Sequence, residues 1–127
     1  MTSALSIGLW IAQIGLAFAF VIHGRAMISP PESMRDRMGN LFAISPRLRT
    51  LIGVAELLAA AGLILPSLTG FLPWLTPVAA VGLVIVMIGA IVFHVQRREF
   101  PNIVFNLVLL ILSAFVACGR WSVLRLG

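Results

Sequence analysis

The sequence lacks the usual features of a soluble enzyme. It contains no lysine and only four acidic residues, and charged side chains make up 10% of its 127 residues. Soluble domains carry about 25% charged residues. The single cysteine, Cys118, excludes an intramolecular disulfide and a Cys-x-x-Cys redox pair. The chain has no glycine-rich phosphate-binding loop, nucleophile elbow or metalloprotease helix. Nothing in it indicates a soluble catalytic module.

What the chain does contain is dominated by four apolar runs. Hydrophobic residues make up 61% of the sequence, and its mean hydropathy is +1.11. The runs cover roughly residues 4–25, 48–65, 74–95 and 101–119. A helix of about 20 apolar residues crosses the roughly 30 Å hydrocarbon core of a bilayer. The sequence therefore predicts a single transmembrane domain over residues 1–127, an all-α integral membrane four-helix bundle.

The arginines predict how the bundle is oriented. Seven of the nine lie in the two connections between spans 1 and 2 and spans 3 and 4 or at the adjoining span ends, and only Arg120 and Arg125 lie on the opposite side. Because basic residues favour the cytoplasmic side, we expect both connections to be cytoplasmic and both termini to lie outside. We expect Arg120 and Arg125 to extend to the outer headgroups. The arginines flank the spans and form no single patch, so the expected partner is the lipid bilayer and not nucleic acid.

The connection between spans 1 and 2 carries signals for a short amphipathic helix. Ser29-Pro30-Pro31-Glu32 offers a hydroxyl cap, a proline at the first helical position and an acid three residues after the cap. We expect a helix in the cytoplasmic interface, acting either as an anchor or as a lid or partner surface over the bundle. Its apolar face would consist of Met34, Met38, Leu41 and Phe42.

Small residues predict the faces on which the spans pack. Helices in lipid approach closely through glycine and alanine, because lipid tails are as apolar as leucine. The polar residues of each span lie on or beside such a stripe. The stripes are Gly8, Ala12, Gly15 and Ala19 in span 1, Ala55, Ala59 and Gly62 in span 2, and Gly82, Val86, Gly89 and Ala90 in span 3.

Glu56 is the leading candidate for a functional residue, because it is the one polar side chain in residues 51–65. An ionisable group at that depth normally faces protein or a water-filled cavity. His23, His94 and Asn106 fall in the same half of the bundle, whereas Gln13 lies towards the other side. These positions predict a cavity open to the cytoplasm, with Glu56 at its floor and Asn106 or His94 as its hydrogen-bond partner.

Each candidate also has a structural interpretation. Glu56 can carry a proton or orient a ligand, or it can be a neutral acid that joins two helices. His94 and His23 can be haem or metal ligands, proton shuttles or interfacial residues. Asn106 can serve as an interhelical hydrogen-bond donor. The two histidines and the carboxylate lie on three different spans, and we predict no metal site from them.

Four segments resemble the DoxX-like family of small four-span bacterial membrane proteins. The most specific is Gly53-Val-Ala-Glu-Leu followed by a small-residue run and Pro66. Glu56, His94 and Arg120 occupy motif positions of that pattern. The segments are Phe20–Arg25, Gly53–Pro66, Ala79–His94 and Phe115–Arg120.

The resemblance implies a multi-pass protein of the bacterial inner membrane associated with redox systems. Some members of the family look like subunits of thiosulfate:quinone oxidoreductases, others like membrane partners in redox-stress complexes, and distant relatives act as assembly chaperones. The first hypothesis is therefore a membrane subunit of a redox-linked complex that binds a quinone or another lipophilic molecule and has a soluble or membrane redox partner. A quinone site needs an apolar slot and a few polar groups, which Glu56, His94, His23 and Asn106 supply. The alternatives are a proton-coupled small-molecule transporter and a non-catalytic assembly partner.

Overall fold

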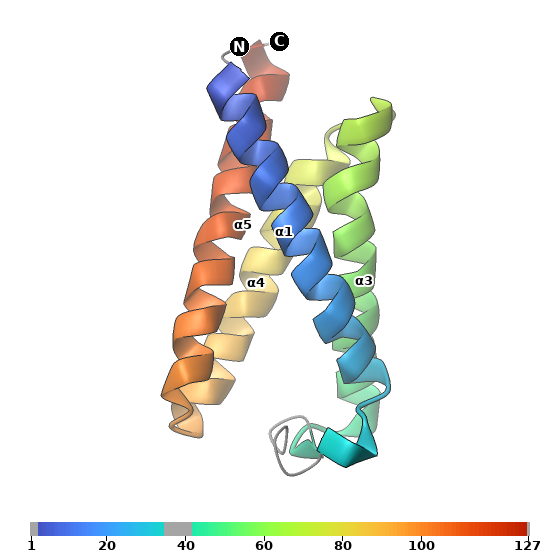
Figure 1. Ribbon diagram of the computed structural model, residues 1–127, viewed down its shortest axis with the longest axis vertical. Coiled ribbons are helices and arrows are strands. Elements are labelled where there is room, and N and C mark those ends of the chain that lie inside the picture. The colour runs from blue at the N-terminus through green and yellow to red at the C-terminus, as the bar shows by residue number, and fades with distance from the viewer. Residues whose placement is uncertain (1–2, 35–41, 127) are drawn as a thin grey trace.

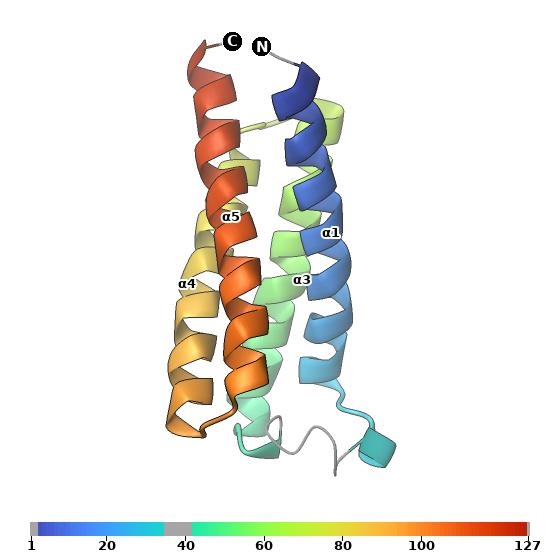
Figure 2. The ribbon, with the colours of Figure 1, turned by 60° about the vertical axis from the view of Figure 1, so that its left-hand side comes forward.

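The computed structural model describes residues 3–34 and 42–126, and within them the chain forms four long helices and no strand. The helices are α1 (Ser3–Ile28), α3 (Pro46–Thr69), α4 (Leu75–Gln96) and α5 (Phe100–Leu126). All four are long and apolar enough to cross a membrane. The two termini lie at one end of the bundle, and the α1–α3 and α4–α5 connections lie at the other (Figures 1 and 2). The expected all-α membrane bundle with four spans is confirmed.

The amphipathic helix expected between spans 1 and 2 is not supported. It falls largely on residues 35–41, which lie outside the described residues. The described part before them contains a single 3-10 turn, η1 (Glu32–Met34).

The second helix runs past the proline at which the sequence predicts its end. α3 includes Pro66 and stops at Thr69, where Gly70 adopts a left-handed φ of 75° and its N–H bonds to Pro66 O. Pro66 has no N–H to donate to the carbonyl four residues earlier. That carbonyl, Gly62 O, instead accepts a hydrogen bond of 2.9 Å from the Thr76 hydroxyl of α4. A side chain from the neighbouring helix thus satisfies the carbonyl that the proline leaves free, as a helix in lipid requires.

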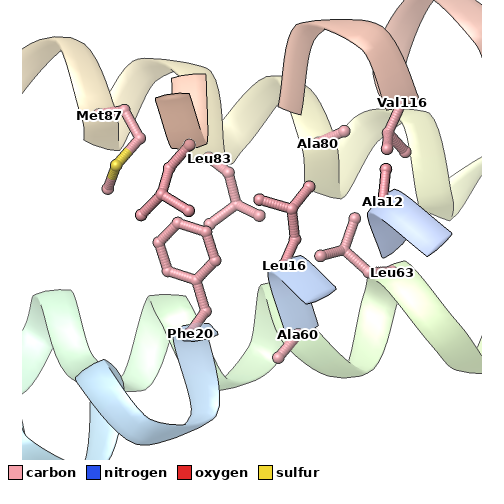
Figure 3. Packing of buried hydrophobic residues seen from close by; sticks show 10 residues of the cluster. Ala12, Leu16, Phe20, Ala60, Leu63, Ala80, Leu83, Met87 and Val116 are labelled. Atoms are coloured by element: carbon pink, nitrogen blue, oxygen red, sulfur yellow. The ribbon is translucent and has the colours of Figure 1, made fainter. Parts of the chain in front are cut away.

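Large side chains fill the centre of the bundle. Leu16 and Phe20 of α1 meet Leu63 of α3 and Leu83 and Met87 of α4, and all five are at most 2% exposed (Figure 3). The closest helix pairs are α1 with α3 and α4 with α5. The four helices thus share one apolar core.

The predicted small-residue stripes are wrong for three of their glycines. Gly15, Gly82 and Gly89 are exposed, and a Cβ added to any of them would meet nothing within 4 Å. The physical reason is volume: leucine, phenylalanine and methionine fill most of the space between the four helices, and glycine is needed only where a neighbouring helix comes close. The residues of α1 that face inward are Leu9, Ala12, Gln13, Leu16, Phe20, Gly24 and Met27.

Candidate functional site

The site begins with a close crossing of α1 and α3 at two glycines. A Cβ added to Gly53 would lie 2.6 Å from the backbone oxygen of Gly24, and a Cβ added to Gly24 would lie 2.9 Å from the backbone oxygen of Gly53. Real Cβ atoms essentially never come that close to a backbone oxygen. Both positions therefore need glycine. The crossing holds the two helices together immediately beside His23 and one turn before Glu56.

At this crossing His23 and Glu56 form a hydrogen-bonded pair. His23 Nδ1 lies 2.7 Å from Glu56 Oε2. The Glu56 side chain is 1% exposed, whereas that of His23 is 46% exposed. The other carboxyl oxygen, Glu56 Oε1, is buried and has no hydrogen-bond partner among the described residues. The prediction that Glu56 bonds to Asn106 or His94 is therefore wrong.

A cavity of about 530 Å³ is lined by Ile44 and Leu48, near the start of α3, and by His94 and Asn102, beside the α4–α5 connection. It therefore lies at the end of the bundle that carries the helix connections. All four sequence candidates, Glu56, His23, His94 and Asn106, border it. His23, Leu48, Gly89 and Phe105 border the cavity and are also exposed, so the cavity reaches the surface of the bundle. The rest of its lining is almost entirely apolar: Ala19, Phe20, Met27, Ile44, Leu48, Ile52, Val86, Met87, Gly89, Ala90, Phe93 and Leu109, with Asn102 as the exception. This combination of an apolar wall and few polar groups is typical of small-molecule sites.

His94 contributes to the cavity wall but pairs away from Glu56. Its Nδ1 lies 2.9 Å from Glu99 Oε1, and the same oxygen accepts a hydrogen bond of 3.2 Å from Arg97 Nε. His94 lies in the last turn of α4, and Arg97 and Glu99 belong to the tight connection to α5, in which Arg98 has a φ of 56°. His94 is thus held by its own turn, and its ring packs edge-on against Phe93.

Asn106 lies on the inner face of α5 and is 8% exposed. Its side chain makes no hydrogen bond to any described residue, so its expected role as an interhelical donor is not seen. An amide that borders a cavity and makes no other hydrogen bond can bond to a molecule inside the cavity.

A second polar layer, missed by the sequence analysis, crosses the bundle near the termini. Arg120 Nε of α5 donates to Gln13 Oε1 of α1, and Gln13 Nε2 donates to Leu63 O and, at 3.3 Å, to Ser67 Oγ of α3. Ser67 Oγ donates to Thr76 Oγ1 of α4 at 2.9 Å. All four helices are therefore joined by one chain of hydrogen bonds.

Arg120 points into this layer instead of extending to the headgroups as expected. Its Nη2 is buried, and its guanidinium carbon lies 5.2 Å from the centre of the Trp10 ring. Gln13, which is fully buried, supplies an acceptor within reach, so the guanidinium turns inward. The sequence does contain a signal for this contact, because Gln13 and Arg120 are an amide and an arginine that fall in the same half of the bundle.

No group of three or more His, Cys, Asp or Glu side chains suited to a metal occurs within residues 3–34 and 42–126. The polar groups at the cavity are a carboxyl–imidazole pair, the two amides of Asn102 and Asn106, and a second imidazole. These groups can accept and donate hydrogen bonds and can take up or release a proton.

The comparison with known families agrees with this arrangement. The family model described as the DoxX-like family matches residues 11–116. The chain belongs to the DoxX-like family. The matched region includes Gly24 and Gly53. It also includes the four candidate residues that border the cavity, Glu56, His23, His94 and Asn106. No curated protein sequence and no solved structure matches the chain.

Proposed function

We propose that this DoxX-like protein binds a lipophilic small molecule with a polar head, of the quinone class, in the cavity beside Glu56. The observation that carries the proposal is that Glu56 belongs to the lining of an apolar cavity and has a buried carboxyl group with one oxygen on His23 and the other without a partner among the described residues. Burying such an oxygen without a partner is costly unless a ligand or water completes its bonding. The cavity volume falls within the range of about 300–1,000 Å³ that ligand pockets occupy.

The way in is from the membrane. Because His23 and Phe105 border the cavity and are exposed on the outside of the bundle, a molecule dissolved in the bilayer can reach Glu56 without passing through water. The tail would lie along the apolar lining and the head against Glu56. In this proposal this end of the bundle faces the cytoplasm from a bacterial inner membrane, as the arginine distribution favours.

The core favours a binding site over a transport path. Leu16, Leu63 and Leu83, which are at most 1% exposed, lie between the cavity and the polar layer of Gln13 and Arg120. A molecule at Glu56 therefore meets packed side chains on the far side. In this proposal the protein holds its ligand for a redox partner in the membrane or at the cytoplasmic surface, as the membrane subunit of a redox-linked complex.

The experiment is to identify the small molecules that stay with the protein when it is purified in native lipid. Gly89 borders the cavity and Gly82 does not, although both lie exposed on α4 and have open space around their Cβ positions. Gly89→Trp is expected to reduce the retained molecule severalfold because the indole occupies the cavity, and Gly82→Trp is expected to leave it unchanged. Mass spectrometry of the extracted molecules measures both. A retained molecule that is equally abundant in both variants, or no retained molecule other than bulk lipid in the wild type, contradicts the proposal.

A further inference from the structure

The unpartnered oxygen of Glu56 restricts what the cavity can bind. The 2.7 Å contact between Glu56 Oε2 and His23 Nδ1 requires a proton between the two atoms. That proton can be carried by an imidazole beside a carboxylate, by an imidazolium beside a carboxylate, or by a carboxylic acid beside an imidazole protonated on Nε2. In each arrangement Glu56 Oε1 carries no proton and can only accept a hydrogen bond.

The remaining arrangement would place an acid proton on Oε1 itself. Oε1 is buried and has no acceptor beside it among the described residues. A proton on Oε1 would be an unpaired donor in the protein interior, which is unfavourable. Oε1 is thus an acceptor in every favourable protonation state of the pair.

We propose that the cavity selects molecules whose head donates a hydrogen bond to Glu56 Oε1, namely a phenol or quinol hydroxyl, over acceptor-only heads such as a quinone or an ether. The inference rests on the proposed function and assigns the reduced form of the ligand class to this site. A hydroxyl also accepts, and the unbonded amide of Asn106, at the same cavity, can donate to its oxygen. Glu56 thus acts as the specificity-determining residue.

The test uses two probes that differ only in the replacement of the hydroxyl proton by a methyl group. Binding of para-decylphenol and of its methyl ether, para-decylanisole, is measured on the full chain in lipid nanodiscs. Because the ether would leave a buried acceptor without a hydrogen bond, the phenol is expected to bind about 10- to 100-fold more tightly. Decyl-substituted benzoquinone, which has only acceptors, is expected to behave like the ether.

Glu56→Gln gives the reciprocal result. The glutamine oxygen can accept from His23 Nδ1–H, which places the NH2 group where Oε1 was, so the cavity then presents a donor. The variant is expected to lose the preference for the phenol and to bind the quinone more tightly than the wild type does. Retained helical circular dichroism and a monodisperse elution profile show that the variant is folded.

The outcomes separate this inference from the proposed function. If neither the phenol nor the quinone binds saturably to the wild type, the proposed function fails. If both bind with equal affinity, or if the quinone binds more tightly, the cavity binds lipophilic molecules but the inference is overturned. The wild-type comparison alone decides this, so a Glu56→Gln protein that does not fold leaves the test intact.

Discussion

Replacing Gly53 with alanine is expected to lower the free energy of unfolding by about 1–3 kcal/mol, the range for overpacking a closely packed interior. The added methyl group would lie 2.6 Å from the backbone oxygen of Gly24 and 2.7 Å from Ile28 Cγ1, so α1 must move away from α3. A backbone cannot give way as the end of a flexible side chain can. The same movement lengthens the contact between His23 and Glu56, so the variant should also bind its ligand less tightly. Unfolding in mild detergent, followed by circular dichroism, measures the first effect.

Gly15→Ala is the matched control. Its Cβ would meet nothing within 4 Å, and alanine is favoured over glycine in a helix by about 1 kcal/mol in soluble hosts. The control is therefore expected to leave stability unchanged or to raise it. If both variants lose stability equally, α1 and α3 do not cross at Gly24 and Gly53, and the basis for the His23–Glu56 pair is removed.

Gln13→Leu is expected to destabilise the protein by about 2 kcal/mol, because it leaves buried polar groups without partners. The change removes the acceptor of Arg120 Nε and the donor to Leu63 O and Ser67 Oγ while nearly preserving volume. Most of the cost comes from the guanidinium, which would be half-buried beside a leucine. The measurement is again unfolding in detergent.

A double-mutant cycle isolates the Gln13–Arg120 contact. Arg120→Leu alone is also expected to destabilise, but Gln13→Leu combined with Arg120→Leu should cost less than the sum of the two, because no charge remains unpaired. Strict additivity would mean that Arg120 extends to the headgroups, as its position near the end of the helix first indicates.

The sequence predicts the architecture well because span length alone decides it. Each apolar run lies almost wholly within one helix, since a bilayer admits little else for such a segment. The end of α3 is an exception, because Pro66 normally stops a helix. No feature of the sequence around Pro66 predicts that Thr76, ten residues later and on another helix, donates a hydrogen bond to the freed carbonyl of Gly62.

The packing faces are predicted less well, because nearly every residue of these helices is apolar. Periodicity then carries little information about which face meets protein and which meets lipid, and the exposed Gly15, Gly82 and Gly89 look the same in the sequence as Gly53.

The candidate site is also only partly predictable from the sequence. Glu56 and His23 are both recognisable as polar residues in apolar runs, but their pairing depends on where α1 crosses α3. The glycines beside them, Gly24 and Gly53, are the one sequence signal for that crossing.

Photolabelling with a diazirine-bearing alkylphenol is the measurement that tests the account most directly, because it shows where a polar-headed lipophilic molecule lies. In native membranes the account predicts saturable labelling of the cavity wall, at residues such as Met87, Phe93 and Leu109, that an excess of unlabelled para-decylphenol suppresses. The apolar groove between α3 and α4, bordered by Leu58, Leu65 and Val78, serves as the comparison surface and should be labelled only non-saturably, as lipid contact is. Labelling that is equal at the two surfaces and insensitive to competition would contradict a binding site at Glu56.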